Sequence, residues 1–150
     1  MIILFISLQK KDMMDTVKNR RTIRKYQQKD ITPDLLNDLL ETSFRASTMG
    51  GMQLYSVVVT RDAEKKEILS PAHFNQPMVK EAPVVLTFCA DFRRFCKYCQ
   101  ERNAVPGYGN LMSFLNAAMD TFWLHRLSVR LPRKPDWVFA IWVLLPIILK

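Results

Sequence analysis

The sequence predicts a single α+β domain in which helices pack against a small sheet, and three observations lead to this fold class. The chain has 150 residues, the length of one domain, and 49% of them are hydrophobic, which is enough for a sizeable core. Two β-branched apolar runs, residues 55–62 and 82–91, have the composition of buried strands. Helical patterns precede, separate and follow these runs, an alternation typical of an α/β or α+β sandwich.

The helix expected after residue 31 has the clearest start signal. Thr32 is a favourable N-cap, Pro33 suits the first helical position, and Asp34 places a negative charge in the first turn. Leucines then recur at helical spacing, so we expect this helix to run to about Arg45 with its leucine stripe in the core. Further helices are expected from Asp15 to about Arg20 and over residues 63–69, 93–103 and 111–121, with turns at 47–53 and 106–110.

Two strands are too few to make an independent sheet for a domain of this size. We therefore expect further strands from a part of the protein that the recognisable elements do not include, or from a partner chain.

The chain is basic, with 22 Lys and Arg against 14 Asp and Glu, a net charge of +8 and a pI near 9.6. This charge favours contact with polyanions, so a basic nucleic-acid-binding protein is one class of function to consider. The cations are not gathered on one recognisable element, however, and no nucleic-acid-binding motif is present. We therefore expect no nucleic-acid partner.

Three cysteines lie close together in the sequence, at Cys89, Cys96 and Cys99. An odd number without a spaced framework does not describe a disulfide scaffold. The Cys-x-x-Cys pair at 96–99 is compatible with half a metal site or a redox pair, but no second pair follows, and a zinc site needs four ligands. We expect reduced thiols, a cytoplasmic protein and no metal site.

The chain opens on an apolar run of eight residues, MIILFISL, which is too short to span a bilayer. Charged residues follow this run at positions 10–12, whereas the charged region of a signal peptide precedes its apolar run. Met13 and Met14 then stand directly before a well-formed segment. We expect the native chain to begin at Met13 or Met14, with residues 1–13 as a leader of no structural use and no membrane as a partner.

The segment NRRTIRKYQ, residues 19–27, gathers four cations around one hydroxyl. Arginine has a planar fork that binds two phosphate oxygens at once, and a threonine hydroxyl adds a further donor. A solvated basic helix end, stabilised by the helix dipole, is the alternative. On the residues alone, a phosphate site made by Arg20, Arg21, Thr22 and Arg24 and a solvated helix end both stay open.

Residues 14–91 resemble the nitroreductase family, whose members are flavoenzymes that hold FMN. Three features carry the resemblance, in order and at family-like spacing. They are Arg-Arg-Thr-Ile-Arg-Lys-Tyr at 20–26, the loop ASTMGGMQLY at 46–55, and an Ala-Pro-Val-Val strand that ends in Ala-Asp at 82–91.

The loop departs from the family pattern at two positions. Ser47 stands where the family has a proline, which loosens the loop, and Gly51 stands where the family has an asparagine, which removes an amide contact to the flavin. Gln53 is kept. The resemblance implies that Thr48, Gly51 and Gln53 bind the edge of the flavin ring and that the arginine cluster at 20–24 binds the FMN phosphate.

The resemblance also implies an architecture and a reaction. Members of the family have a three-layer α+β sandwich and usually form a tight homodimer with FMN at the interface. NAD(P)H passes a hydride to the flavin, and a small-molecule acceptor, either a nitroaromatic, a quinone or another flavin, then takes the electrons. The flavin supplies the redox chemistry while the protein binds and orients it, so no catalytic side chain is assigned.

The tail, residues 122–150, differs in composition from the rest of the chain. It contains all three tryptophans, no glycine, and five Lys or Arg residues against one Asp. A C-terminal strand or a basic segment on a membrane surface is a structural explanation. We favour a shifted reading frame. Each amino acid largely fixes the first two bases of its codon, so a frame shifted by one base leaves about one base per codon free. From residue 122, suitable free bases give an Ala-rich helix, a Gly-Leu-Gly break and an apolar strand, as the family has here.

If the tail is out of frame, residues 14–121 are the N-terminal part of a nitroreductase-like domain that is incomplete at its C-terminus. Such a chain lacks the family's remaining strands, a later basic phosphate contact and the C-terminal segment exchanged between subunits. We expect it to bind FMN weakly or not at all, so a non-functional remnant of such an enzyme is the second alternative.

Overall fold

The computed structural model of the chain describes residues 18, 26, 29–107, 109–130 and 140–142. The short helix predicted between Asp15 and Arg20 and the leader at 1–13 lie outside the described residues. The elements in chain order are α2 (Pro33–Ser43), the 3-10 turn η1 (Met49–Gly51), β1 (Tyr55–Thr60), α3 (Ala63–Leu69), the 3-10 turn η2 (Ser70–His73), α4 (Pro77–Glu81), β2 (Val85–Ala90), α5 (Phe92–Glu101), α6 (Leu111–Arg130) and β3 (Ala140–Trp142).

β2 is the central strand of a three-stranded sheet with the order β1-β2-β3. It pairs antiparallel with β1, where Tyr55 lies opposite Ala90, and parallel with β3, where Val85 lies opposite Ala140. All six residues of β2 are buried, which confirms the buried strand predicted here. The third strand lies in the tail, so the C-terminal strand considered for that segment is present over three residues.

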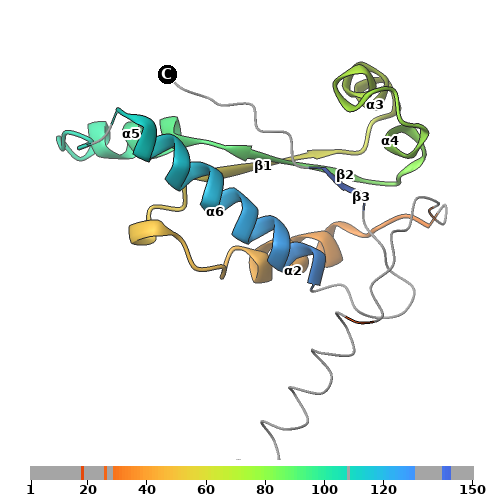
Figure 1. The fold of residues 1–150 in the computed structure, drawn as a ribbon. Coiled ribbons are helices and arrows are strands. Elements are labelled where there is room, and N and C mark those ends of the chain that lie inside the picture. Colours follow the sequence, from red (N-terminus) through yellow and green to blue (C-terminus); the bar gives the residue numbers. More distant parts are fainter. Residues whose placement is uncertain (1–17, 19–25, 27–28, 108, 131–139, 143–150) are drawn as a thin grey trace, which may run out of the picture.

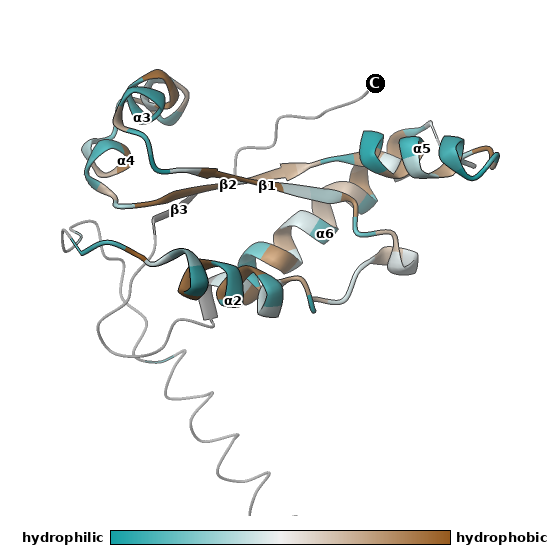
Figure 2. Cartoon of the chain, turned by 180° about the vertical axis from the view of Figure 1, so that it is seen from behind, coloured by the Kyte–Doolittle hydropathy of each residue, from teal (hydrophilic) through white to brown (hydrophobic). Residues whose placement is uncertain are grey.

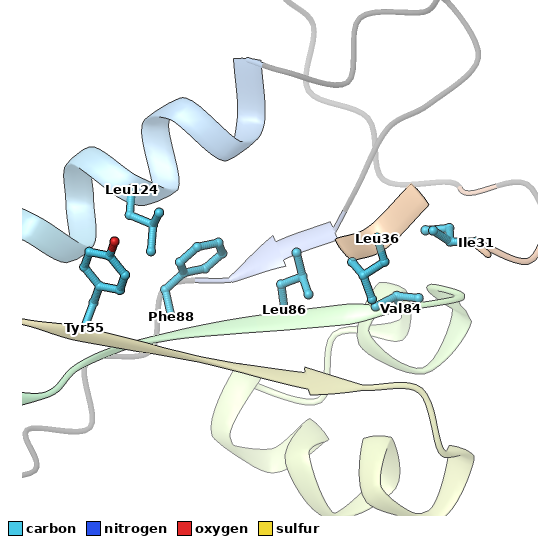
Figure 3. Packing of buried hydrophobic residues seen from close by; sticks show 7 residues of the cluster. All are labelled: Ile31, Leu36, Tyr55, Val84, Leu86, Phe88 and Leu124. Atoms are coloured by element: carbon cyan, nitrogen blue, oxygen red, sulfur yellow. The ribbon is translucent and has the colours of Figure 1, made fainter. Parts of the chain in front are cut away.

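The helices cover the two faces of the sheet unequally. α2 and α6 lie together on one face, α3 and α4 lie on the opposite side near one end of the strands, and α5 follows at the other end (Figure 1). The main core forms between the sheet and the α2–α6 layer, where Phe88 and Leu124 are both fully buried (Figure 3). Its buried members are Ile31, Leu36, Tyr55, Val84, Leu86, Phe88 and Leu124.

α2 forms where its capping signals predict it. The Thr32 hydroxyl oxygen accepts a hydrogen bond from the Leu35 amide at 3.4 Å, and Pro33 occupies the first turn. Hydrophobic and hydrophilic residues alternate around the helix (Figure 2), and Leu36 faces the core. The helix ends at Ser43, slightly before the predicted end at Arg45. The helices predicted over 63–69 and 93–103 are likewise confirmed as α3 and α5.

The strand predicted over residues 55–62 is shorter and less buried than expected. β1 ends at Thr60, and the side chains of Val58 and Val59 are 52% and 39% exposed. β1 is an edge strand of the described sheet, and the buried Tyr55 marks its well-covered start. A β-branched run indicates a strand, but it does not require that both faces of the strand are buried.

The prediction that the helix starting at residue 111 ends at residue 121 is wrong. α6 continues to Arg130, into the segment with atypical composition. Thr121, Leu124 and Ser128 are all buried, so one face of the helix continues at helical spacing past the predicted end. None of the described helices has both the length and the apolar character needed to cross a membrane.

Candidate functional site

Residues 48–54 lie between α2 and β1 and contain three of the predicted site residues, Thr48, Gly51 and Gln53. We call this segment the flavin loop because the resemblance assigns it to the flavin ring. The other four, Arg20, Arg21, Thr22 and Arg24, lie outside the described residues. The structure therefore describes the loop side of the candidate site and says nothing of the arginine cluster.

The loop is built around a single 3-10 turn with an unusual backbone. The Gly51 amide donates to the Thr48 carbonyl at 3.3 Å, and the Met52 amide donates to the Met49 carbonyl at 3.2 Å. Gly50 and Gly51 have φ values of +58° and +69°, in the left-handed region that favours glycine. A Cβ added to Gly51 would have no heavy atom within 4 Å, so the backbone angle, and not crowding, favours glycine at this position.

The left-handed backbone gives the replacement at position 51 a structural meaning. Asparagine is enriched in the left-handed region, second to glycine, because its short side chain tolerates this conformation. Gly51 therefore keeps a backbone that asparagine also adopts, while it lacks the side-chain amide. The open space beside Gly51 leaves room for a ligand or for a side chain.

Gln53 adopts the left-handed conformation as well, with φ of +52°, although it is not a glycine. Such a residue costs of order 1–3 kcal/mol and persists where its surroundings hold it. The Gln53 carbonyl accepts from the Tyr55 amide at 2.8 Å and from an Arg94 guanidinium nitrogen at 3.0 Å. The Gln53 side chain is exposed, so its amide is presented to solvent.

Asp120 of α6 accepts hydrogen bonds from both ends of the flavin loop. One carboxylate oxygen accepts from the Met49 amide at 2.8 Å, and the other accepts from the Leu54 amide at 3.1 Å. Asp120 is not among the site residues predicted from the sequence. The signal that marks it is an acidic residue in the otherwise uncharged, Ala-containing stretch SFLNAAMDT at 113–121.

Tyr55 follows the loop as the first residue of β1 and is 2% exposed. Its ring stacks on Phe44 with centroids 5.9 Å apart, and the Arg94 guanidinium lies 5.8 Å from its ring centroid. Burial raises the pKa of the phenol most, the charge of Arg94 lowers it, and the charge of Asp120 raises it by less. Tyr55 therefore stays a neutral packing group near neutral pH, and it is not a candidate base.

The cysteines do not assemble into a metal site among the described residues, where no group of three or more metal-ligating side chains occurs. Cys89 and Cys99 are buried and Cys96 is partly buried, all as free thiols. Burial, and secondly the neighbouring Cys99, raise the pKa of Cys96. The Cys96 thiol is therefore protonated near neutral pH and is a poor nucleophile.

The flavin loop has the donors and the space that a flavin ring edge requires. Thr48 offers a hydroxyl, Gln53 an exposed amide, and Gly51 a backbone that a ligand can approach closely. These groups come from one short segment held by α5 and α6. The loop residues thus fit the ring edge of FMN.

Comparison with known proteins places this site in a family context. The model of the nitroreductase family matches residues 17–91, a segment that includes both the arginine cluster and the flavin loop. The "NADH dehydrogenase" of Thermus thermophilus is 39% identical over 80 residues, which are 53% of this chain and 39% of the relative. The "FMN reductase (NADPH)" of Bacillus subtilis is 33% identical over 89 residues, 59% of this chain and 36% of the relative.

A solved structure matches more of the chain. The crystal structure of a protein from Bacteroides fragilis NCTC 9343, assigned as an oxidoreductase, is 92% identical with a TM-score of 0.75 and covers 78% of this chain and 48% of its own. The chain thus spans less than half the length of each of these three relatives. The described fold corresponds to an incomplete α+β fold of that type.

Proposed function

The chain belongs to the nitroreductase family, and on this premise we propose that it is part of an FMN-dependent oxidoreductase. The proposed reaction carries a hydride from NAD(P)H, by way of FMN, to a nitroaromatic, a quinone or another flavin. The observation that carries the proposal is the family match over residues 17–91, which spans both candidate FMN-binding segments. Bound FMN supplies the hydride-accepting ring, and the protein supplies binding and orientation.

We assign different parts of FMN to the two segments. Arg20, Arg21, Thr22 and Arg24 bind the phosphate, because arginine forks and a hydroxyl are suited to a phosphate dianion. The flavin loop binds the ring edge through Thr48, the Gly51 backbone and the Gln53 amide. No side chain of this chain is assigned a proton-transfer role.

A homodimer is the proposed assembly. What supports it, besides the family, is an apolar stripe on α6 whose members recur at helical spacing and are 38–71% exposed. The stripe consists of Leu111, Leu115, Met119 and Phe122. We further propose a cytoplasmic protein with a small-molecule electron acceptor and without a nucleic-acid or membrane partner.

We also propose that residues 122–150 are read out of frame, and that residues 14–121 are the N-terminal part of the domain and still bind FMN, because α6 remains helical and buried on one face through Ser128. The change of composition at residue 122 supports this proposal. The coding DNA across residues 115–130 tests it. An open shifted frame that encodes an Ala-rich helix and a Gly-Leu-Gly break is expected, whereas stop codons in that frame would exclude the proposal.

FMN and riboflavin titrations test the assigned phosphate site, because riboflavin has the same ring without the phosphate. Replacing Arg20 and Arg21 together by alanine removes charge-assisted hydrogen bonds of about 1.5–3 kcal/mol each, so FMN binding should weaken at least about tenfold. Riboflavin binding should not change. Lys18→Ala, which removes an exposed cation just before the cluster, is the control.

Three outcomes contradict the proposed function or its site assignment. Equal affinity of the wild-type chain for FMN and riboflavin would remove the phosphate assignment. Salt-dependent retention on DNA without any flavin binding would favour the basic nucleic-acid-binding protein. A chain that binds neither flavin nor DNA and does not unfold cooperatively would favour the non-functional remnant.

A further inference from the structure

Asp120 has a buried charge that the proposed function does not explain. Its side chain is fully buried, at 0% exposure, in the middle of α6. A carboxylate removed from water is unfavourable unless hydrogen bonds replace its hydration. Both of its oxygens have such a partner, and both partners are main-chain amides of the flavin loop.

The two amides that bind Asp120 are near the two ends of that loop. Met49 begins the 3-10 turn, and Leu54 is the last residue before β1. They lie 71 and 66 residues before Asp120 in the sequence, so one side chain closes the loop against a distant helix. The backbone between the two contacts is therefore fixed at both ends.

The conformation between these contacts needs support. Gly50, Gly51 and Gln53 all have positive φ, and the hydrogen bonds within the loop make up a single turn. Left-handed backbone at a residue other than glycine persists where the surroundings hold it in place. Asp120 holds the Leu54 amide, directly after Gln53.

Arg94 supports the same segment from α5. Its guanidinium donates to the Gln53 carbonyl at 3.0 Å, so a cation binds the carbonyl of Gln53 while the Asp120 anion binds the following amide. Charge-assisted hydrogen bonds are the stronger class. Arg94 is exposed, whereas Asp120 is buried, so the contact from α6 is the one shielded from water.

We propose that Asp120 is the positioning residue of the flavin loop. Its carboxylate fixes the backbone that presents Thr48, Gly51 and Gln53 to the flavin, and it acts without touching the flavin itself. The identity of the ligand rests on the proposed function, while the contact between Asp120 and the loop does not. Asp120 also lies outside residues 17–91, the segment that the family model matches.

The test measures hydrogen exchange of individual amides by NMR without FMN, followed by an FMN titration. Asp120→Asn keeps the shape of the side chain but replaces one acceptor oxygen by an NH₂ group, which cannot accept from an amide. Exchange at Met49, Leu54 or both should accelerate by about tenfold or more, and the FMN Kd should rise by a similar factor. The amides of β2 should keep their exchange rates.

Ser128→Ala is the matched control. Ser128 is a buried residue of the same helix, and its hydroxyl donates to the Leu124 carbonyl at 2.8 Å instead of to the loop. This variant should leave the exchange of the loop amides and the FMN Kd unchanged. A role of Asp120 in helix stability alone would move the two variants together.

The possible outcomes separate the proposal from the proposed function. Unchanged exchange at both Met49 and Leu54 in Asp120→Asn overturns the proposal, and so does faster exchange with an unchanged FMN Kd. If the wild-type chain binds no FMN but the variant releases the two amides, the proposed function fails and the loop-fixing role stands.

Should Asp120→Asn not fold, the wild-type protein decides the question by itself. The amides of Met49 and Leu54 should be protected well above that of Gly50, whose amide donates no hydrogen bond within the described part of the chain. Exchange of Met49 and Leu54 as fast as that of Gly50 contradicts the proposal.

Discussion

At the scale of single residues, position 51 links backbone geometry to ligand binding. Its φ of +69° is adopted readily by glycine and tolerated by asparagine, and the space beside it is open. In the sequence alone, Gly51 is only the loss of an amide. The structure adds that the backbone at Gly51 already has the left-handed conformation that an asparagine at this position would need.

Substitution at Gly51 tests this view. Gly51→Ala should destabilise the chain by about 1 kcal/mol, because alanine is strained in the left-handed region. Gly51→Asn should destabilise it less and should bind FMN more tightly than Gly51→Ala, because it restores an amide on a compatible backbone. Urea unfolding and FMN titration measure the two effects. Equal stability and equal affinity of the two variants contradict the account.

His125 makes stability depend on pH. Burial, and secondly the charge of Arg126, lower the pKa of its imidazole from the ordinary value of 6.5, and its ring lies edge-on to Phe88 at 5.7 Å. Below about pH 6.5 the unfolded state therefore binds more protons than the folded state. The protonation of His125 therefore leaves the free energy of unfolding unchanged above about pH 6.5 and lowers it as the pH decreases below this value toward the lowered pKa.

Urea unfolding at pH 7 and pH 5 checks the contribution of His125. His125→Phe keeps an aromatic contact with Phe88 but cannot titrate, so its loss of stability between the two pH values should be smaller than that of the wild type. Part of the loss should remain, because burial also lowers the pKa of His73. An identical loss in variant and wild type would exclude His125 as a source.

At the scale of elements, α6 is where the prediction from the sequence and the structure differ most. The change of composition at residue 122 indicated an end of the helix, yet the buried face continues through Leu124 to Ser128. A segment therefore joins the core when its residue types recur at helical spacing, whatever the origin of its composition. Spacing is the physical requirement, and overall composition is only correlated with it.

Two neighbouring residues of α6 test whether this extension is part of the core. Leu124→Ala should destabilise the chain by about 2–5 kcal/mol, because Leu124 is fully buried against the sheet. Trp123→Ala should change stability by less than about 0.5 kcal/mol, because Trp123 is 64% exposed. Urea unfolding measures both. Small effects in both variants would mean that α6 does not pack beyond residue 121.

Local signals explain which elements were predictable. The cap and proline at the start of α2, and the apolar β-branched run of β2, act within a few residues of themselves. The role of Asp120 depends instead on partners 66 and 71 residues away, which no local pattern reports. The exposure of Val58 and the short β3 likewise depend on how the elements are arranged.

At the scale of the whole molecule, the chain matches less than half the length of each of its three relatives. The family and the α+β class followed from the motifs of residues 14–91, because those motifs are local in sequence. The proposed FMN binding depends in addition on contacts between elements, which no local motif describes. The exposed apolar stripe of α6 supports the proposed homodimer.

Sedimentation velocity of the purified chain with FMN, followed at the flavin absorbance, tests the central claim most directly. If the chain is an FMN-binding member of its family, flavin should sediment with the protein, and the flavin-carrying species should have the mass of two chains. Flavin that stays behind while a folded protein sediments would contradict the account.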